Sequence, residues 1–467
     1  MLKASFFKNL ISGLMFIFFL SSTTFGQDWS GFQADVRHSG ESCVDFLSKD
    51  IASLWTFKPT EHIWSYKQGS SVWSSSAAIA RVKDKTLVFV GFYNHNLYAL
   101  DAADGRLLWK FIAGGRLNSA PFFAEINSRP TVFVVSSDRT IYCLDAANGE
   151  KFWSYETLKW SYTVSESVAS SPIVVSIDDK PIVIFSIWNS DCAPLNFLQR
   201  GEVYCLDAAS GNKIYSTFLS SSPLNSPAFS YIDGHPMIYV SSTDGRAFGL
   251  DARDGKILWE VTLCAGIHST PSVGVVKNKE VVFLGSRFGN LYCLDAANGA
   301  VIWSKKFGYF IDSTPAIAKV NDKTFLYFGA YDRNVYCLDA ETGKTIWKFK
   351  TGDYVAASCA IAKIKGAPVV FVHSLDNNLY CLDALDGSLF WKKDTGRLIW
   401  KYQTRGDTNW SSPAVSSFQG KPLLVFPSYD GNLYAFSATS GTKTVEVLAE
   451  TSYKESSEKV FLYDYAD

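Results

Sequence analysis

The fold class that the sequence predicts is all-β: a single eight-bladed β-propeller of four-stranded antiparallel blades. Two markers repeat through the chain and set the number of blades, and the strand pattern within each unit sets its architecture. The first marker, of the form Leu-Tyr-Cys-Leu-Asp-Ala-x-x-Gly-x-x-x-Trp, begins at Leu97, Ile141, Val203, Ala247, Leu291, Val335, Leu379 and, in a weaker copy, Leu433. The second, a short Ser/Thr-rich element, begins at Ser74, Asn118, Ser170, Asn225, Ser269, Ser313, Ala357 and Ser411. Either marker gives eight units, most of them 44 residues apart.

Each unit contains four short segments with the composition of β-strands. In the unit that begins at Ser313, the apolar runs are separated by turns rich in Asp, Asn and Gly, and the last run ends near Lys350. Alternating β-rich runs of this length, bounded by such turns, are typical of strands and hairpins. Four antiparallel strands at this period indicate a propeller blade, although the Trp-Asp and Gly-His markers of WD40 blades are missing.

The aspartate of the first marker is predicted to be a turn residue. In the unit that begins at Leu291, Asp295 ends a strand, where its carboxylate can accept backbone N–H groups, and Gly299 permits a positive φ. The seven equivalent positions are Asp101, Asp145, Asp207, Asp251, Asp295, Asp339 and Asp383. Because the residue recurs in every unit, we interpret it as structural rather than catalytic.

The tryptophan of the marker is predicted to dock between neighbouring blades. Burying an indole removes about 150–250 Å² from water, which makes it a strong contact between repeats. The predicted docking residues are Trp55, Trp109, Trp153, Trp259, Trp303, Trp347 and Trp391, with Tyr215 as a substitute in one unit.

This Leu-Asp-Ala-x-x-Gly-x-x-x-Trp pattern resembles the tryptophan-docking repeat of pyrroloquinoline-quinone-type propellers. The resemblance extends from Trp55 to about Val445, and residues 31–40 are similar to the lead-in of such proteins. That superfamily includes quinoprotein alcohol dehydrogenases and a non-enzymatic propeller of outer-membrane assembly. The chain resembles the non-enzymatic type more closely, because it has no adjacent cysteine pair and few inserted residues. The resemblance implies the fold, whereas function depends on sites built on that fold.

The ring is predicted to close through the N-terminal strand. The segment from Ser53 to Lys58 resembles an outer strand with no blade before it, and the eighth unit has Val445 where a tryptophan is expected. Pairing this strand with the eighth blade would remove an exposed edge. In the alternative, the segment from Thr442 to Ala449 completes the blade and the N-terminal strand adds outside it.

The N-terminus is predicted to be a secretory signal. Residues 1–26 contain Lys3 and Lys8, then an apolar run from Leu10 to Leu20, with cleavage expected before Gln27. The run is too short for a typical transmembrane helix, although an N-terminal anchor is the alternative. We therefore expect a protein exported to the periplasm or the extracellular space, with a lead-in at 27–52, the propeller at 53–449 and a tail at 450–467.

Composition excludes some classes of partner. Hydrophobic residues make up 47% and charged residues 19% of the chain, as in a globular protein. Without the two lysines of the signal, the formal charge changes from −1 to −3, which is 42 minus 45. This balance does not favour nucleic acid as a partner, and no other stretch is long and apolar enough for a transmembrane segment.

The positions of the nine cysteines in the sequence do not predict a disulfide pattern. Five recur at one strand position, and equivalent positions in neighbouring blades should lie beyond the roughly 7 Å Cα limit for a disulfide. These are Cys143, Cys205, Cys293, Cys337 and Cys381, which we interpret as small buried apolar residues. The pairing of Cys43, Cys192, Cys264 and Cys359 stays open, and the sequence has no Cys-x-x-Cys pattern that would predict a metal site.

Three long connections between units carry aromatic residues. Each contains a Trp-x-Tyr motif, and the unit that begins at Ser170 has a further insertion from Trp188 to Gly201. Trp400 follows Trp391 by nine residues, and we interpret it as part of a loop because no second and third strands accompany it. The candidate ligand-binding residues are Trp64, Tyr66, Trp73, Trp160, Tyr162, Trp188, Trp400, Tyr402 and Trp410, with the polar Asn118, His268 and Asp312. Alternatively, the aromatic residues only pack the longer loops against the blades.

The preferred function is a non-catalytic binding or scaffold propeller. An aromatic rim around the central funnel would suit a protein, peptide or carbohydrate ligand, without a cofactor. One alternative is a pyrroloquinoline-quinone-dependent dehydrogenase, which needs calcium ligands and a carboxylate base. The other is a polysaccharide-binding or polysaccharide-processing exported protein. No catalytic residues are assigned, because spacing assembles neither a nucleophile–base pair nor a glycosidase-like carboxylate pair.

Overall fold

The structure is a computed structural model that describes most of the propeller. The described residues are 37, 41–46, 51–57, 75–157, 168–189, 200–219, 223, 225–264, 266–364, 366–389, 401–403, 411–418, 421–428 and 432–438. The predicted signal at 1–26 and the predicted tail at 450–467 lie outside these residues. Across the described part of the chain, no helix has the length and apolar character needed to cross a membrane.

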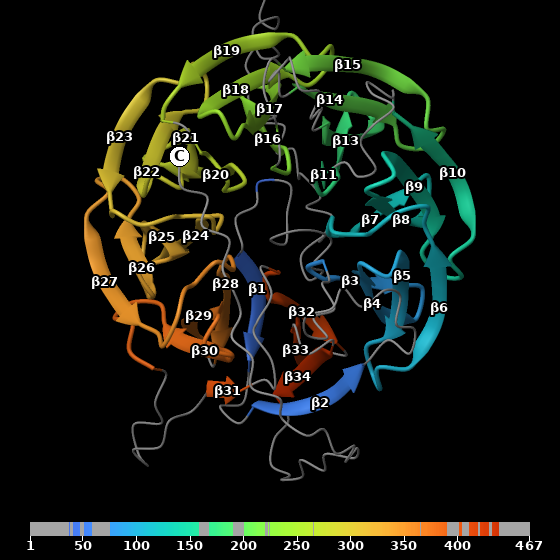
Figure 1. The fold of residues 1–467 in the computed structure, drawn as a ribbon. Coiled ribbons are helices and arrows are strands. Elements are labelled where there is room, and N and C mark those ends of the chain that lie inside the picture. The colour runs from blue at the N-terminus through green and yellow to red at the C-terminus, as the bar shows by residue number, and fades with distance from the viewer. Residues whose placement is uncertain are drawn as a thin grey trace, which may run out of the picture.

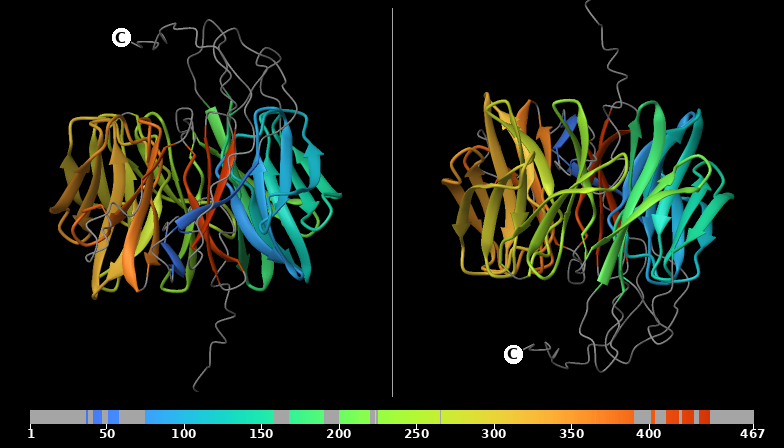
Figure 2. Two further views of the ribbon diagram at one scale, coloured as in Figure 1. Left: turned by 90° about the horizontal axis from the view of Figure 1, so that it is seen from below. Right: turned by 90° about the horizontal axis from the view of Figure 1, so that it is seen from above.

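Eight antiparallel sheets stand side by side around a central axis, as the prediction required (Figures 1 and 2). Blades 1–4 contain β3 (Ala78–Val82), β4 (Lys85–Gly91), β5 (Asn96–Asp101), β6 (Leu107–Ile112); β7 (Phe122–Ile126), β8 (Arg129–Val135), β9 (Thr140–Asp145), β10 (Lys151–Glu156); β11 (Val168–Ala169), β12 (Ile173–Ile177), β13 (Lys180–Asn189), β14 (Arg200–Asp207), β15 (Lys213–Leu219); and β16 (Ala228–Ile232), β17 (His235–Ser241), β18 (Arg246–Asp251), β19 (Ile257–Thr262). Blades 5–8 contain β20 (Ser272–Val276), β21 (Lys279–Gly285), β22 (Asn290–Asp295), β23 (Val301–Lys306); β24 (Ala316–Val320), β25 (Lys323–Ala330), β26 (Asn334–Asp339), β27 (Thr345–Lys350); β28 (Ala360–Ile364), β29 (Ala367–Ser374), β30 (Asn378–Asp383), β31 (Lys401–Gln403); and β32 (Ala414–Phe418), β33 (Lys421–Pro427), β34 (Leu433–Ala438), β2 (Ile51–Phe57). In each blade the strands run in chain order from the axis outward, except that the N-terminal β2 is the outer strand of blade 8.

Ring closure by the N-terminal strand is confirmed. Strand β2 pairs antiparallel with β34, and Trp55 lies opposite Ala435. This is the register in which Trp347 lies opposite Cys337 within blade 6. The first and last parts of the chain therefore share one sheet.

The residues assigned to a lead-in also join the ring. Strand β1 (Glu41–Phe46) pairs parallel with β28, on the side of blade 7 that faces the axis (Figure 1). Upstream of it, the carbonyl of Arg37 accepts a hydrogen bond of 2.8 Å from the backbone N–H of Val273. The Arg37 guanidinium lies 3.1 Å from a carboxylate oxygen of Glu280. The N-terminal segment thus contacts two blades from inside the ring before it supplies the outer strand of a third.

The predicted docking is observed for five of the tryptophans, whereas the Trp55 side chain and Trp391 lie outside the described residues, and the structure shows why the motif also needs its glycine. The Trp259 indole N–H donates a 3.0 Å hydrogen bond to the carbonyl of Ala296 in the next blade. Its ring covers Gly299, where a Cβ atom would lie 2.5 Å from the indole. Gly299 also has a φ of +74°, so both the turn and the indole exclude a side chain. Similar contacts join Trp109 to Gly149, Trp153 to Gly211, Trp303 to Gly343 and Trp347 to Gly387, and Tyr215 covers Gly255.

A second set of contacts joins the blades near the axis. A backbone N–H at the start of one inner strand donates to a hydroxyl oxygen at the same position in the next blade. The pairs are Ala120 with Ser171, Ser171 with Ser226, Thr270 with Thr314, Thr314 with Ser358, Ser358 with Ser412 and Ser412 with Ser76, at 2.9–3.2 Å. The Ser/Thr marker therefore links neighbouring blades at six junctions in the described part of the chain, and one of these pairs, Ser412 with Ser76, crosses the closure between blades 8 and 1.

The turn aspartates and the strand cysteines behave as predicted. Asp295 accepts a 2.9 Å hydrogen bond from the backbone N–H two residues later, and the other six aspartates make the same contact. The five strand cysteines are free and buried, and burial raises the pKa of each thiol. Cys264 and Cys359 are also free, whereas the Cys43 side chain and Cys192 lie outside the described residues.

Blade 7 departs from the prediction in its outer strand. In blade 6, Tyr336 lies opposite Lys348, the residue after the docking tryptophan. A repeat of 44 residues would place Lys392 opposite Tyr380, but Lys401 lies there instead. The outer strand thus resumes nine residues later than predicted, immediately after Trp400. The interpretation of this segment as a loop is therefore wrong for residues 401–403, which form β31, while Trp400 itself lies outside the described residues.

The sequence explains this shift as a tandem repeat of the outer strand. Residues 387–395, GSLFWKKDT, and residues 396–404, GRLIWKYQT, are identical at five of nine positions. Leu389, from the first copy, lies opposite Leu382, as the regular register requires. Strand β31 comes from the second copy. The sequence therefore has two copies of the docking motif for the one outer strand of blade 7. Trp391 and Trp400 themselves lie outside the described residues.

Replacing a docking tryptophan should destabilise the whole ring. We expect Trp259→Ala to lower the free energy of unfolding by about 3–5 kcal/mol, because it leaves a cavity over Gly299. The matched control is Leu258→Ala, which changes the neighbouring side chain on the exposed side of β19, where it is 43% exposed. Denaturant unfolding measures both variants, and equal losses would contradict the docking role.

The tandem repeat should be dispensable for stability. Deleting residues 392–400 places Trp391 directly before Lys401, which restores the spacing of a regular blade. The melting temperature should stay within about 2 °C of the parent, because loop closure depends only weakly on length. Deleting the nine residues 348–356 of blade 6, which has one copy, is the control and should prevent folding. A similar loss in both deletions would show that both copies are required.

A buried histidine should make the protein sensitive to acid. His373 is fully buried between blades 7 and 8, with its ring centroid 4.5 Å from that of Phe426. Burial lowers the pKa of His373 to about 3, against a smaller opposing effect from the backbone at Ser411. Because an unfolded histidine titrates near pH 6.5, the stability from this neutral side chain is complete above that pH and is lost as the pH falls toward 3.

The expected difference is measurable at moderate pH. Between pH 7.5 and pH 5, the parent should lose about 2 kcal/mol more unfolding free energy than His373→Gln. His95→Asn, at a partly exposed turn histidine with a positive φ, is the control and should follow the parent. Parallel pH profiles for the parent and His373→Gln would refute the assignment.

Candidate functional site

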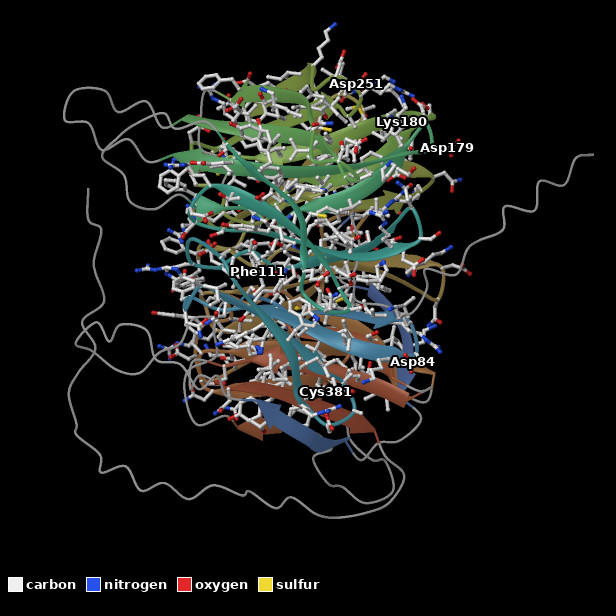
Figure 3. All side chains as sticks on the ribbon, turned by 90° about the vertical axis from the view of Figure 1, so that its right-hand side faces the viewer. Asp84, Phe111, Asp179, Lys180, Asp251 and Cys381 are labelled. Carbon is white, nitrogen blue, oxygen red and sulfur yellow. The ribbon has the colours of Figure 1, made fainter. Side chains whose placement is uncertain are left out.

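The two faces of the ring differ in their loops. One, the turn face, is formed by the turns after the first and third strands of each blade; Asp84, Asp179 and Asp251 lie toward it in Figure 3. The other, the loop face, is formed by the turns after the second strands and by the connections between blades. Phe111, near the end of an outer strand, lies toward this second face (Figure 3). The strands on either side of the predicted long connections end or begin on the loop face, whereas most residues of these connections lie outside the described residues.

A cavity of about 150 Å³ lies on the loop-face side of the inner strands of blades 5, 6 and 7. Equivalent positions from three consecutive blades form its wall, together with one turn residue from blade 5. The lining residues are His268, Thr270, Arg287, Asp312, Thr314, Ala356 and Ser358. The structure therefore brings the predicted His268 and Asp312 together.

An ion pair crosses the wall of this cavity. The Arg287 guanidinium donates to both carboxylate oxygens of Asp312, at 3.2–3.3 Å. Such two-pronged pairs have a defined geometry as well as strength. The Asp312 side chain is only 9% exposed, whereas that of Arg287 is 34% exposed. The charges of Arg287 and Asp312 cancel in the cavity wall. Their hydrogen bonds also hold the turn after β21 against the connection between blades 5 and 6.

His268 is held in its neutral form beside this pair. Burial, followed by repulsion from Arg287, lowers the pKa of His268 to about 4, and Asp312 opposes this shift only in part. At neutral pH the ring therefore offers one N–H donor and one acceptor nitrogen. A histidine with so low a pKa is a weak base near pH 7.

A row of aromatic rings extends from the cavity across the loop face. The Arg287 guanidinium lies 5.7 Å from the ring centroid of Phe310, whose ring is 5.5 Å from that of Tyr331. The rings of Tyr331 and Tyr354 stack at 5.2 Å, and the Arg333 guanidinium lies 5.7 Å from the centroid of Tyr354. The row thus joins the loops of blades 5, 6 and 7 and has an arginine at each end.

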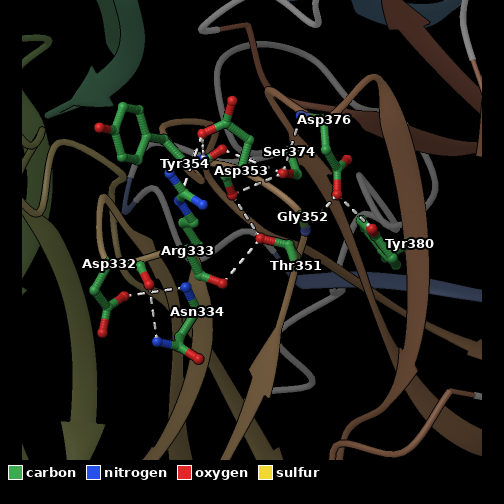
Figure 4. A network of polar contacts seen from close by, with 10 residues as sticks. All are labelled: Asp332, Arg333, Asn334, Thr351, Gly352, Asp353, Tyr354, Ser374, Asp376 and Tyr380. Carbon is green, nitrogen blue, oxygen red and sulfur yellow. Dashed lines mark hydrogen bonds and ion pairs between the residues drawn. The ribbon is translucent and has the colours of Figure 1, made fainter.

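Hydrogen bonds hold the far end of this row in place. Figure 4 shows the connection from Thr351 to Tyr354 between blades 6 and 7. The Thr351 hydroxyl donates to the carbonyl of Arg333 at 2.9 Å, and the backbone N–H of Gly352 donates to Asp376 at 2.6 Å. The same carboxylate oxygen of Asp376 accepts from the Tyr380 hydroxyl at 2.5 Å. The connection is therefore tied to the turns of both adjacent blades.

The other polar and strand-end candidates do not join the cavity. Asn118 occupies the position of His268 in blade 2, three blades away, and its buried side-chain oxygen has no hydrogen-bond partner in the described part of the chain. Trp188 lies at the end of β13, opposite Gly201, so the predicted insertion begins and ends as strand. The two residues thus lie on the loop-face side of blades 2 and 3.

Most of the aromatic candidates cannot be placed. Trp64, Tyr66, Trp73, Trp160, Tyr162, Trp400 and Trp410 lie outside the described residues. Tyr402 was expected in a loop, but its backbone lies in β31 opposite Leu379. That register matches Phe349 opposite Val335 in blade 6, where the Phe349 ring packs against Tyr380 of the next blade. The Tyr402 backbone therefore occupies the register of Phe349, because the strand resumes in the second copy of its motif.

Arg287 and the row of rings were not among the residues predicted from the sequence. The available signal was local: the turn Ser-Arg-Phe-Gly in blade 5 has an arginine and a phenylalanine where blades 6 and 7 have Tyr-Asp-Arg and Leu-Asp-Asn. Comparing turns between units, rather than searching the long connections alone, would have identified Arg287 and Phe288 as exceptions to the repeat.

The described cavity does not suit a calcium-bound quinone. Calcium takes six to eight oxygen ligands, whereas the lining supplies one carboxylate, Asp312, which Arg287 already holds. The carboxylates of pyrroloquinoline quinone would also meet an arginine whose charge is balanced. Among the residues that the structure describes, no three His, Cys, Asp or Glu side chains are grouped so that they could hold a metal ion.

Comparisons with known proteins agree with the fold. The family model for outer membrane protein assembly factor BamB matches residues 54–238, 197–272, 243–394 and 316–460. The quinohemoprotein alcohol dehydrogenase ADHIIG from Pseudomonas putida HK5 has a TM-score of 0.67 at 13% identity, covering 91% of this chain and 82% of its own. BamB from Moraxella catarrhalis has a TM-score of 0.53 at 16% identity, covering 84% and 99%. A europium-containing methanol dehydrogenase has a TM-score of 0.64 at 14% identity, covering 88% and 98%.

These structures share the fold with this chain, and their low identities support nothing finer. No curated protein matches the sequence. The family match, by contrast, extends over almost the whole propeller and agrees with the repeat, the eight blades and the docking tryptophans. The chain belongs to the family of outer membrane protein assembly factor BamB, whose propellers carry the pyrroloquinoline-quinone-type repeat.

Proposed function

We propose that this chain is an exported, non-catalytic propeller that binds a partner through the loop face around the Arg287–Asp312 pair. The proposal rests on one observation: the two charged groups that line the cavity, Arg287 and Asp312, are hydrogen-bonded to each other. Both oxygens of Asp312 accept from Arg287, and His268 has a pKa of about 4. Neither group is suited to proton transfer at neutral pH, whereas both can orient a bound molecule.

The family and the loop face support a binding role. The family description names an assembly factor, a role exercised through contacts with other molecules. Exposed aromatic residues gather on the loop face beside the cavity, namely Phe288, Tyr309 and Phe310. The predicted signal at residues 1–26 supports a location in the periplasm or the extracellular space. The partner is a protein, a peptide or a carbohydrate.

The rival function is a quinone-dependent dehydrogenase. Residues 27–467 are incubated with pyrroloquinoline quinone and calcium, and dye reduction is followed with alcohols and aldoses as donors. We expect no substrate-dependent reduction, because the described cavity offers neither calcium ligands nor an available carboxylate base. Turnover that disappears on chelation would contradict the proposal.

Binding is tested on the same preparation. Peptides from outer-membrane β-strands and neutral oligosaccharides are screened for their effect on the melting temperature. At least one class should stabilise the protein, and Phe310→Ala should reduce the effect. Phe152→Ala is the matched control, because Phe152 is similarly exposed but lies on an outer strand. Stabilisation that is equal in both variants would place the binding surface elsewhere.

A further inference from the structure

We infer that the cavity on the loop-face side of blades 5, 6 and 7 binds one ring of an uncharged oligosaccharide, whose next units lie over the exposed rings of the loop face. The inference rests on the proposed binding function and names the ligand class for the same site. The cavity measures about 150 Å³, a volume that accepts one six-membered ring.

The wall of the cavity presents oxygen atoms at fixed positions. The backbone N–H of Thr270 donates to the hydroxyl of Thr314 at 3.2 Å, and that of Thr314 donates to the hydroxyl of Ser358 at 2.9 Å. These contacts belong to the set that joins neighbouring inner strands, so the hydroxyl oxygens are held by the fold itself. Hydroxyl groups both donate and accept, as do the hydroxyl groups of a sugar. The wall is therefore chemically matched to a polyhydroxylated ring.

The charge balance favours an uncharged ligand. Arg287 and Asp312 neutralise each other within the wall, at 3.2 Å. An anionic ligand would approach the Asp312 carboxylate, and a cationic ligand would approach the Arg287 guanidinium. Because the pair has no net charge, it gives an ionic ligand little net attraction to offset the cost of leaving water, and both charged classes are disfavoured. A neutral ligand can use the outer N–H groups of Arg287 as donors without breaking the pair.

Exposed aromatic rings lie on the two loops that supply this ion pair. Phe288 follows Arg287 in its turn and is 60% exposed. Tyr309 and Phe310 precede Asp312 in its connection and are 58% and 46% exposed. Clusters of exposed apolar side chains mark binding sites, and aromatic rings offer flat apolar surfaces to the C–H faces of sugars. The cavity and the rings together suit a chain of sugar units rather than a single one.

The platform is held in place before any ligand arrives. The Phe310 ring contacts Tyr331 on one side and lies beneath the Arg287 guanidinium. Tyr331 continues the row to Tyr354, whose connection is tied to both adjacent blades (Figure 4). A rigid platform loses little conformational entropy on binding, which favours affinity.

The first experiment tests the ligand class and the platform. Calorimetric titration is done with maltohexaose, cellohexaose and chitohexaose as neutral probes, and with hexagalacturonate as an acidic probe. At least one neutral hexamer should bind, and hexagalacturonate should bind more weakly. Phe310→Ala should weaken binding of the neutral hexamer by about tenfold, as for one lost aromatic contact. Phe310→Tyr should retain binding, and Phe152→Ala should have no effect.

The second experiment changes the charge of the wall at nearly constant size. Asp312→Asn leaves the positive charge of Arg287 unbalanced, so the preference should shift from the neutral hexamer to hexagalacturonate. Thermal unfolding checks that the variant is folded, and Arg287→Gln with Asp312→Asn restores neutrality and should restore the preference for the neutral hexamer.

The outcomes separate this inference from the proposed function. Absence of binding by every neutral hexamer, equal binding of hexagalacturonate by the parent, or no effect of Phe310→Ala would overturn the oligosaccharide assignment. If outer-membrane peptides still stabilise the protein through Phe310, the binding function stands with a different ligand. Chelation-sensitive turnover with pyrroloquinoline quinone would instead remove the proposed function itself.

Discussion

The contact between an aromatic ring and a glycine of the next blade is the interaction on which the rest of this structure depends. Trp259 shows its three parts: a ring that covers Gly299, an N–H that donates to Ala296, and a buried position between two sheets. Because each of blades 1–6 supplies the ring and the following blade supplies the glycine, every such contact fixes the position of the next sheet. The hydrogen bonds near the axis, such as that from Thr270 to Thr314, join neighbouring blades in the same way at the opposite edge of the sheets. Two rows of contacts between blades define the angle at which they pack, and that angle brings positions from three blades into one cavity.

The same regularity decides which residues are free for function. In most turns the residues serve the fold, as Asp332 does when it accepts hydrogen bonds from Asn334 and Tyr336. Function is therefore expected where a unit departs from its neighbours. Arg287 is such a departure, and its partner Asp312 belongs to the following connection. The cavity forms because two adjacent units differ from the repeat in complementary ways.

The parts of the fold that the sequence predicted are those set by local chemistry. The turn at Asp295, the positive φ at Gly299 and the docking of Trp259 follow from residue types at fixed spacing, so eight units were enough to predict the ring. The outer strand of blade 7 was predicted incorrectly, because two copies of one motif compete for a single position and spacing cannot choose between them. The link between His268 and Asp312 was not predictable in detail, since it depends on the angle between blades. Strand β1 was missed for a related reason: its partner lies about 320 residues away along the chain.

The N-terminal segment has a consequence for how the ring is made. A polypeptide synthesised from its N-terminus emerges with β1 and β2 first, yet their partners β28 and β34 come late in the chain. These first two strands therefore remain unpaired while the intervening blades assemble one upon another. The ring can close only after the last blade has formed, so closure is the final step of folding. A chain of this design has two strand segments without partners until its last blade forms, and such segments are open to premature pairing with other strands.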